Sequence, residues 1–200
     1  GGVRHSLDQI SILYFQDQLG FDMKNNIPDI AAYTLMVMPL VAFLGSLGSG
    51  VVSDKFFHGE RGPVAAALYF FEAFVIACSA VILYMGWVGP SHSGIIVGCL
   101  ILIFISVTVN STHSLVGAAA PMDIGGKKMA GFAAGVIDSF QYYGGAISFI
   151  VTGQVLKATQ QTHGYLYWYV IMCSFGITGG VIMLLMERKK RRLALLTQGT

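Results

Sequence analysis

Long apolar runs alternate with short polar segments along the whole chain. Four runs have the length of a membrane span, about 20 mainly apolar residues, and a fifth is nearly as strong. The four lie at roughly 63–87, 94–117, 130–156 and 165–186, and the fifth lies at 30–52. These runs carry few charges and are apolar on every side, which is typical of helices surrounded by lipid. The pattern therefore predicts an all-α membrane protein.

The opening stretch, residues 1–19, is more polar than these runs and contains an arginine, a histidine and two aspartates. We interpret it as the end of a longer span whose beginning lies outside the sequence, with an interfacial helix as the alternative. The chain starts with two glycines, without a Met and without a recognisable signal peptide. We therefore expect residues 1–200 to form one transmembrane unit taken from a longer protein.

Composition supports a lipid environment. Of the 200 residues, 54% are hydrophobic and only 11% are charged, whereas a soluble domain carries about 25% charged residues. The mean hydropathy is +0.67. Cys78, Cys99 and Cys173 all fall inside apolar runs and form no CxxC pair, so we interpret them as small buried or lipid-facing side chains. We expect no metal and no cofactor.

Positive charge is distributed unevenly between the two sides of the membrane. Short loops make neighbouring spans antiparallel, so the segments 53–62, 121–129 and 187–200 fall on one side and hold nine of the 12 Lys and Arg. The other side holds Lys24 and Lys157, and the twelfth basic residue lies in the opening stretch. Basic loops stay in the cytoplasm, so we expect a multi-pass protein of the plasma or inner membrane with a cytoplasmic C-terminal tail. The tail serves as a topology signal that also attracts anionic lipid, and we expect no nucleic-acid partner.

Small residues recur at four-residue spacing in three of the spans. Such small-xxx-small faces let membrane helices approach closely, so we expect a tight bundle. The predicted contact positions are Gly45, Ser49 and Ser53, then Gly131 and Gly135, then Gly176 and Gly180, with Gly144 and Gly145 as a further close crossing or flexible point.

Two spans carry a polar stripe on an otherwise apolar helix. Asp138, Gln141 and Tyr142 lie three and four residues apart and share one face, and Asn110 and His113 begin a similar face in the preceding span. Polar groups in hydrocarbon are costly and usually face a bundle interior or a watery cavity. The stripes indicate either hydrogen bonds between helices or a solute cavity lined by both, and the two can coexist.

A third polar group, Arg4, His5 and Asp8, opens the chain. A guanidinium offers planar, permanently charged donors that suit phosphate or carboxylate, so an inward-facing Arg4 would bind an anion. The alternative is an interfacial arginine that reaches the headgroups. Glu72 lies inside the run 63–87, as an ion-pair member or a protonated acid, and receives no role. No nucleophile–base arrangement, HExxH or phosphate loop is present in the sequence, so we do not expect an enzyme.

Two longer motifs point to a known family. The segment Gly50–Pro63, GVVSDKFFHGERGP, resembles the loop between the eighth and ninth helices of the major facilitator superfamily, in the form found in its organophosphate:phosphate antiporters. Met122–Gly135, MDIGGKKMAGFAAG, followed by Gln141–Gly145, resembles that family's tenth-to-eleventh loop and eleventh helix. The opening Arg4–Asp8 resembles the seventh helix, where the family places a phosphate-binding arginine. The resemblance implies a C-terminal six-helix half, with helix 7 partial and helices 8–12 complete.

The resemblance also implies a function. Such transporters hold their solute near the midplane between two six-helix halves, so the partner would be an N-terminal six-helix half. The family would exchange an organophosphate, such as a sugar phosphate or glycerol phosphate, for inorganic phosphate by alternating access. It implies a cytoplasmic charge network of Asp54, Lys55 and Arg61, for which a simple topological anchor is the alternative. The implied solute-binding residues are Arg4, His5, Asp8, Asn110, His113, Asp138, Gln141 and Tyr142.

Several alternatives remain open at this point. A sensor of the same fold would bind a sugar phosphate and signal with little transport. A transporter of a carboxylate or another anion would couple to protons through Asp138 or His113, and a structural subunit would bind no solute. Family members often carry Tyr-Gly-Pro in the tenth helix, where this chain has Asn110-Ser-Thr-His113, so the organic part of the substrate is left unassigned.

Overall fold

The computed structural model describes residues 2–25, 27–57 and 61–198, and it describes the backbone alone for 118–127, 160–163, 193–194 and 197–198. All regular elements of the described residues are helices, which confirms the all-α class. They are α1 (Gly2–Asp17), α2 (Asp29–Phe56), α3 (Arg61–Tyr84), α4 (His92–Ser114), the π-helical turn η1 (Leu115–Ala119), α5 (Ala120–His163) and α6 (Leu166–Gln198).

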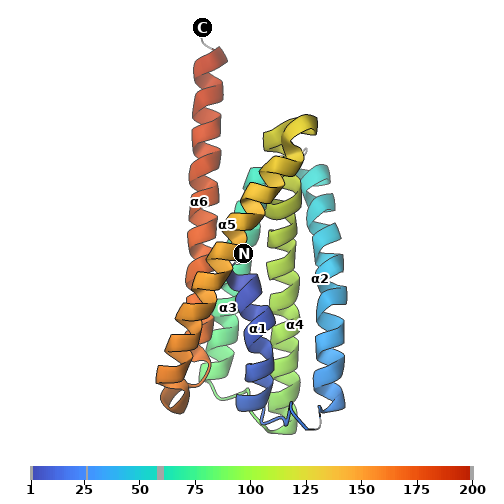
Figure 1. Ribbon diagram of the computed structural model, residues 1–200, viewed down its shortest axis with the longest axis vertical. Coiled ribbons are helices and arrows are strands. Elements are labelled where there is room, and N and C mark those ends of the chain that lie inside the picture. Colours follow the sequence, from blue (N-terminus) through green and yellow to red (C-terminus); the bar gives the residue numbers. More distant parts are fainter. Residues whose placement is uncertain (1, 26, 58–60, 199–200) are drawn as a thin grey trace.

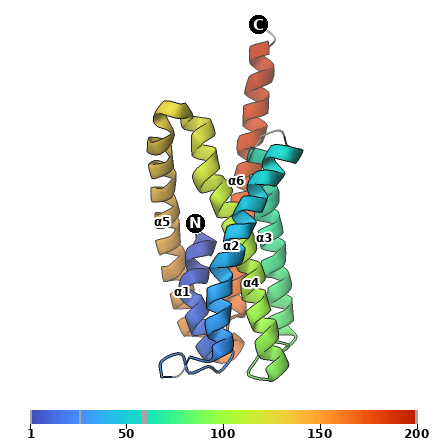
Figure 2. The same ribbon diagram turned by 90° about the vertical axis from the view of Figure 1, so that its right-hand side faces the viewer.

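The helices run up and down along one long axis (Figure 1). The joins α2–α3 and α4–α5 and the end of α6 lie at one end of the bundle, and the joins α1–α2, α3–α4 and α5–α6 lie at the other (Figure 2). Helix α1 begins partway along the bundle. The three segments that hold most of the lysines and arginines therefore lie at the same end.

The expected loop at 121–128 is wrong, because this segment is helical. The chain reverses direction around η1 and the first turns of α5 (Figure 2), without leaving helical backbone. A π turn absorbs an additional residue, and Pro121 stands in the first turn of α5, where a helix does not need the missing N–H. The C-terminal tail is likewise helical and extends α6 well beyond the bundle (Figure 1).

Local sequence explains where several helices begin and end. Pro28 is the N-cap residue of α2, and the hydroxyl of Ser91 caps α4 by accepting a hydrogen bond of 3.1 Å from the Gly94 N–H. Gly86, just after α3, has φ of 75°, a conformation that side chains with a Cβ rarely adopt. These signals mark where α2 and α4 begin and where α3 ends.

Four helices are long and apolar enough to cross a membrane. They are α2, α3, α4 with the first residues of η1, and α6 as far as Arg192. Four of the five expected full spans therefore meet this criterion. The fifth expected span, 130–156, lies in α5, where polar side chains such as Asp138 and Gln141 lower the hydropathy. Its role as a span, like that of 1–19, stays a prediction.

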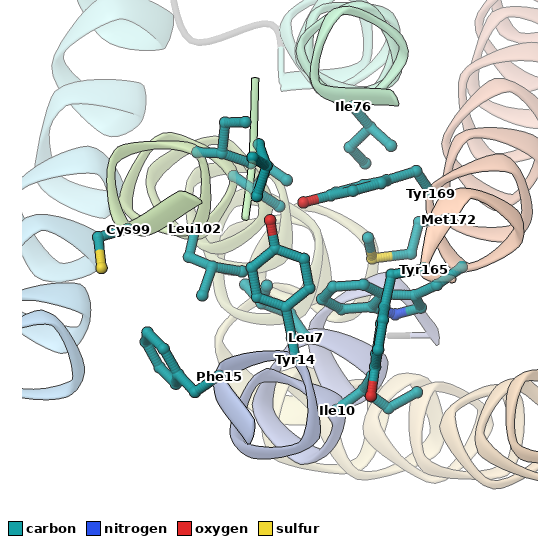
Figure 3. Packing of buried hydrophobic residues seen from close by; sticks show 14 of the residues in the cluster. Leu7, Ile10, Tyr14, Phe15, Ile76, Cys99, Leu102, Tyr165, Tyr169 and Met172 are labelled. Carbon is teal, nitrogen blue, oxygen red and sulfur yellow. The ribbon is translucent and has the colours of Figure 1, made fainter. Parts of the chain in front are cut away.

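An aromatic cluster joins α1 to α6 at the centre of the core (Figure 3). Tyr14 of α1 contacts three fully buried rings, Tyr165, Trp168 and Tyr169, with ring centroids 5.4, 5.6 and 6.2 Å away. The cluster is extended by the apolar residues Leu7, Ile10, Ile76, Leu102 and Met172. Because aromatic pairs add to the burial of their area, this cluster fixes the position of α1 in the bundle.

Glycines allow close helix contacts at some of the predicted positions. A Cβ on Gly45 would lie 2.6 Å from the Ser111 Oγ of α4, and a Cβ on Gly176 would lie 3.2 Å from the Ala73 Cβ of α3. The prediction for Gly131 and Gly135 is wrong within this chain, because no described atom lies within 4 Å of a Cβ at either position. Both glycines belong to α5, whose upper part stands apart from the other helices in Figure 2.

Candidate functional site

Helix α1 presents two different faces at helical spacing. Leu7 and Tyr14 are fully buried in the core, whereas Arg4, Asp8 and Ser11 line a cavity on another side of the helix. The apolar face holds the helix in place, so the polar face is held toward the cavity. The spacing i, i+4, i+7 of the three polar residues was visible in the sequence.

Two hydrogen bonds hold the helix that carries Arg4. The indole N–H of Trp168 donates to the Ser6 Oγ over 2.9 Å, and the Tyr165 hydroxyl donates to the Asp17 Oδ2 over 2.7 Å. Trp168 and Ser6 are both fully buried, and a buried indole N–H without an acceptor would be costly. Ser6 stands two residues from Arg4, so this bond fixes the backbone close to the candidate anion-binding residue.

The cavity lies between α1, α2 and α4 and has a volume of about 560 Å³. This size falls in the range of small-molecule sites, roughly 300–1,000 Å³. Its α2 wall is mainly apolar, with Met38, Ala42 and Phe43, and its polar groups come mostly from α1 and α4. The polar lining residues are Arg4, Asp8, Ser11, Ser46, Ser106, Asn110, His113 and Ser114.

Hydrogen bonds between α2 and α4 fix the second wall. The Ser46 hydroxyl donates to the Asn110 backbone carbonyl over 3.3 Å, and the Ser106 hydroxyl donates to the Met38 carbonyl over 3.3 Å. Pro39 lies inside α2 and also lines the cavity. Because proline has no N–H, the carbonyl of residue 35 loses its helical donor at this wall. The α2 wall thus offers hydrogen-bonding groups beside its apolar side chains.

Arg4 is the main fixed positive charge of the cavity. Its Nε lies 3.7 Å from the Oδ2 of Asp8, one turn further along α1, and both side chains are partly exposed. A partly exposed ion pair within one helix contributes little to stability. An anion in the cavity could therefore replace Asp8 as the partner of the guanidinium at low cost, and the fork of N–H donors would fit its oxygens.

His5 points away from this cavity and joins α1 to α5. A Cβ on Gly145 would lie 2.5 Å from the His5 Cδ2, so the imidazole packs directly on the α5 backbone. The ring centroids of His5 and Tyr142 are 4.9 Å apart, with the rings tilted by 39°. The close crossing predicted for Gly144 and Gly145 is confirmed at Gly145, where glycine leaves room for the His5 ring, whereas no described atom lies within 4 Å of a Cβ at Gly144.

Asp138 and Gln141 approach His113 from the α5 side. A Cβ on Gly117 would lie 3.2 Å from the Gln141 Nε2, 3.6 Å from the Asp138 Oδ1 and 4.0 Å from the His113 Cε1. The Nδ1 of His113 and both amide atoms of Gln141 are buried, and each has no hydrogen-bond partner among the described residues. Buried polar atoms are normally paired, so these atoms are candidates for contacts with a solute or with water.

The structure separates the eight predicted site residues into two groups. Arg4, Asp8, Asn110 and His113 line the cavity. His5, Asp138, Gln141 and Tyr142 lie at the junction of α1, η1 and α5, and His113 connects this junction to the cavity. Whether these residues bind solute stays a prediction.

Three serines that line the cavity were missed at the level of sequence. Ser11 is seven residues after Arg4, and Ser106 is four residues before Asn110, so both continue stripes that had been recognised. Ser46 belongs to α2, where no polar stripe marks the cavity face. Helical spacing alone could have identified the first two, but the third needs the packing of α2 on α4.

The predicted charge network lies at the α2–α3 join, about two helical turns beyond Ser46, which lines the cavity. Asp54 and Lys55 are exposed near the end of α2, and Arg61 is the first residue of α3. Residues 58–60 of the motif lie outside the described part of the chain, as does the side chain of Lys127 in the second motif. The network therefore stays a prediction.

The described residues contain no group of three or more His, Cys, Asp or Glu that could hold a metal ion. What the cavity does offer is one arginine, one histidine, an asparagine and several hydroxyls around a space for a small molecule. Forked cationic donors with hydroxyl groups suit the recognition of a small oxyanion that carries a polar organic part.

Comparison with known proteins finds relatives among bacterial membrane proteins. The chain is 27% identical over 184 residues to the membrane sensor protein UhpC of Escherichia coli, an alignment that covers 90% of the chain and 37% of that protein. It is 28% identical over 144 residues to the glycerol-3-phosphate transporter of Bacillus subtilis, covering 72% of the chain and 29% of the relative. It is 25% identical over 197 residues to the glycerol-3-phosphate transporter of Haemophilus influenzae, covering 92% and 37%.

The chain is related to the organophosphate:phosphate antiporters of the major facilitator superfamily. Together with the four helices that could span a membrane, this relationship makes it an integral membrane protein. The chain spans only 29% to 37% of the length of these curated relatives. No family model and no solved structure matches it.

Proposed function

We propose that the chain is the C-terminal half of a secondary transporter that binds an organophosphate and exchanges it for inorganic phosphate by alternating access. In this proposal α1 is the later part of the seventh helix and α2 to α6 are helices eight to twelve. One observation carries the proposal: Arg4, Asn110 and His113, from two helices, line the same cavity of about 560 Å³. Two of the relatives are named glycerol-3-phosphate transporters, which agrees with this solute class.

The proposed mechanism assigns a role to each part of the cavity. The phosphate group would displace Asp8 from the Arg4 guanidinium, and Asn110, His113 and the serines would bind the organic part. An N-terminal half would close the open side of the cavity and supply a second cation. Solute held between the halves would stabilise a closed state and so allow rocking to either side. The junction of His5, Tyr142, Asp138 and Gln141 would transmit the movement of α5 to α1.

The test uses the full-length protein in proteoliposomes loaded with inorganic phosphate. Wild type should exchange external labelled phosphate, and an organophosphate should compete for this exchange. Arg4→Lys keeps the charge but loses the forked donors, so exchange should fall at least tenfold with normal membrane insertion. Ser174→Ala, an exposed position on α6, serves as the matched control. Normal exchange by Arg4→Lys would refute the proposed role of Arg4.

The second candidate function is a sugar-phosphate sensor, because a membrane sensor protein matches 90% of the chain. The same cavity would bind solute, and the signal would pass to a partner in place of transport. Flux measured beside equilibrium binding separates the two functions. Tight binding of a sugar phosphate with negligible flux would favour the sensor, whereas flux that saturates with the same affinity would favour the transporter.

A further inference from the structure

A second, smaller chamber lies behind Arg4, on the opposite side of α4 from α2. Its volume is about 210 Å³, and its walls come from α1, α3, α4 and α6. Arg4 and His113 line both this chamber and the main cavity. The remaining polar groups of the chamber are Tyr69 and Glu72 of α3, Thr112 of α4 and Thr178 of α6.

Glu72 faces this chamber from a helix that is otherwise apolar. Its side chain is only 2% exposed, while its neighbours Phe71 and Phe74 are 54% and 64% exposed on the outer side of α3. An acid inside a membrane-spanning helix is costly in hydrocarbon, so it usually faces the bundle interior or a watery cavity and marks a functional site. Here the helix turns its acid inward and its phenylalanines outward, so the sequence has placed a carboxyl group inside the bundle.

The groups around Glu72 do not form a permanent ion pair with it. Among the described residues, no lysine or arginine nitrogen lies within salt-bridge distance of its carboxyl group, and Arg4 pairs with Asp8 on the side of the main cavity. The titratable or charged groups that line the chamber with Glu72 are Arg4 from α1, Tyr69 from α3 and His113 from α4. The described lining residues of α6 are Phe175, Thr178, Gly179 and Ile182, none of which titrates.

The side chain of Thr112 fits a protonated partner. Its hydroxyl donates to the Thr108 carbonyl over 2.9 Å, so its Oγ1 retains lone pairs that can accept a hydrogen bond. Thr112 and Glu72 line the same chamber, and a carboxylic acid O–H is a donor that such an oxygen can accept. One carboxyl group with hydroxyl neighbours does not provide the six or more oxygens of a hard metal ion site. A proton is the cation that this arrangement can hold.

We propose that Glu72 is a proton-binding site coupled to the anion cavity through the wall that Arg4 and His113 share. A proton from water would bind the Glu72 carboxylate to form a carboxylic acid, whose O–H is donated to the Thr112 Oγ1, and it would return to water when the site empties. An anion beside Arg4 and a proton on Glu72 add opposite charges on the two sides of one wall. Binding of each therefore favours binding of the other, and this coupling is reciprocal. The coupling rests on the proposed function, whereas the proton site does not.

Infrared difference spectroscopy of the full-length protein in liposomes tests the proton site directly. Wild type should show the C=O stretching band of a buried protonated carboxyl group, and this band should decrease as the pH is raised. Glu72→Gln, which has nearly the same shape, should lose the band. Asp22→Asn is the matched control, because Asp22 lies in the exposed loop between α1 and α2, and it should keep the band.

A band that persists in Glu72→Gln would overturn the proposal. A wild-type band that does not change with pH would also overturn it, because Glu72 would then be a permanently neutral structural acid. Thr112→Val provides an independent variant if Glu72→Gln folds poorly. It removes the hydroxyl and should shift the pH at which the band is lost, and an unchanged pH midpoint would count against the site.

Measurements with inorganic phosphate then distinguish a failure of the proposed coupling from a failure of the proposed function. If phosphate stabilises the protein against heat, it should also shift the pH midpoint of the Glu72 band, and the same midpoint with and without phosphate would overturn the coupling. If phosphate does not stabilise the protein against heat at any pH, the proposed function fails. The pH titration of the band still tests whether Glu72 is a proton-binding site.

Discussion

Helix α1 has an apolar side that packs in the core and a charged side that faces the cavity, and this arrangement positions Arg4. The core side is held by aromatic contacts of Tyr14 and by the hydrogen bond from Trp168 to Ser6. The cavity side carries Arg4 and Asp8, whose ion pair is long and partly exposed. The rigid contacts therefore hold the helix backbone, while the charged groups keep the freedom to change partners.

The hydrogen bond between Trp168 and Ser6 leads to a prediction at this scale. Ser6→Ala leaves the buried indole N–H without an acceptor, which should lower the free energy of unfolding by about 1–3 kcal/mol. Ser174→Ala, at an exposed position of α6, should change it by less than about 0.5 kcal/mol. Thermal unfolding of the full-length protein in detergent measures both. Equal stability of the two variants would show that the bond contributes nothing.

Helices α2 and α4 form the wall of the cavity because they can approach closely. Gly45 lies directly against the Val107 carbonyl and Ser111, and serines on both helices bond to backbone carbonyls across the contact. In membranes, such close packing and such hydrogen bonds replace the hydrophobic driving force that is available in water. The cavity is thus a consequence of where small residues occur on α2.

Gly45 and Gly48 offer a matched pair for a prediction about this contact. A Cβ at Gly45 would meet Ser111 at 2.6 Å and the Val107 carbonyl at 3.0 Å, whereas no described atom lies within 4 Å of a Cβ at Gly48. Alanine raises helix propensity by about 0.5–1 kcal/mol over glycine. Gly48→Ala should therefore be neutral or stabilising, and Gly45→Ala should be destabilising and reduce solute binding.

Parallel melting curves of the two glycine variants, with and without solute, provide the measurement. If Gly45→Ala is as stable as Gly48→Ala and binds solute normally, the α2–α4 contact does not shape the cavity.

At the scale of the whole molecule, much of the arrangement followed from the pattern of apolar runs. The runs predicted α2, α3, α4 and α6, and the spacing of polar residues predicted the faces of α1 and α4 that line the cavity. Two features were not predictable in this way. Pro121 and the glycines after it predicted a loop, but proline occurs both in loops and in the first turn of a helix, and here the segment is helical. The chamber of Glu72 depends on residues from four helices, which no local pattern records.

The arrangement of the whole bundle also predicts its orientation in the membrane. The α2–α3 join, the α4–α5 join and the end of α6 share one end of the bundle (Figure 1), and this end holds most of the basic residues. The positive-inside rule then places it in the cytoplasm. In a background without Cys78, Cys99 and Cys173, a membrane-impermeant thiol reagent on intact cells should label Ser93→Cys and leave Lys190→Cys unlabelled. The opposite labelling would reverse the proposed topology.

The most direct test of the account is whether inorganic phosphate binds the full-length protein through Arg4. A ligand at 100 times its Kd stabilises the folded state by about 2.7 kcal/mol, so wild type should show a higher Tm that increases with phosphate concentration. Arg4→Lys should lose most of this shift at the same phosphate concentrations while it keeps the Tm of wild type without phosphate. A phosphate-dependent shift of equal size in both proteins, or none in wild type, would contradict the account.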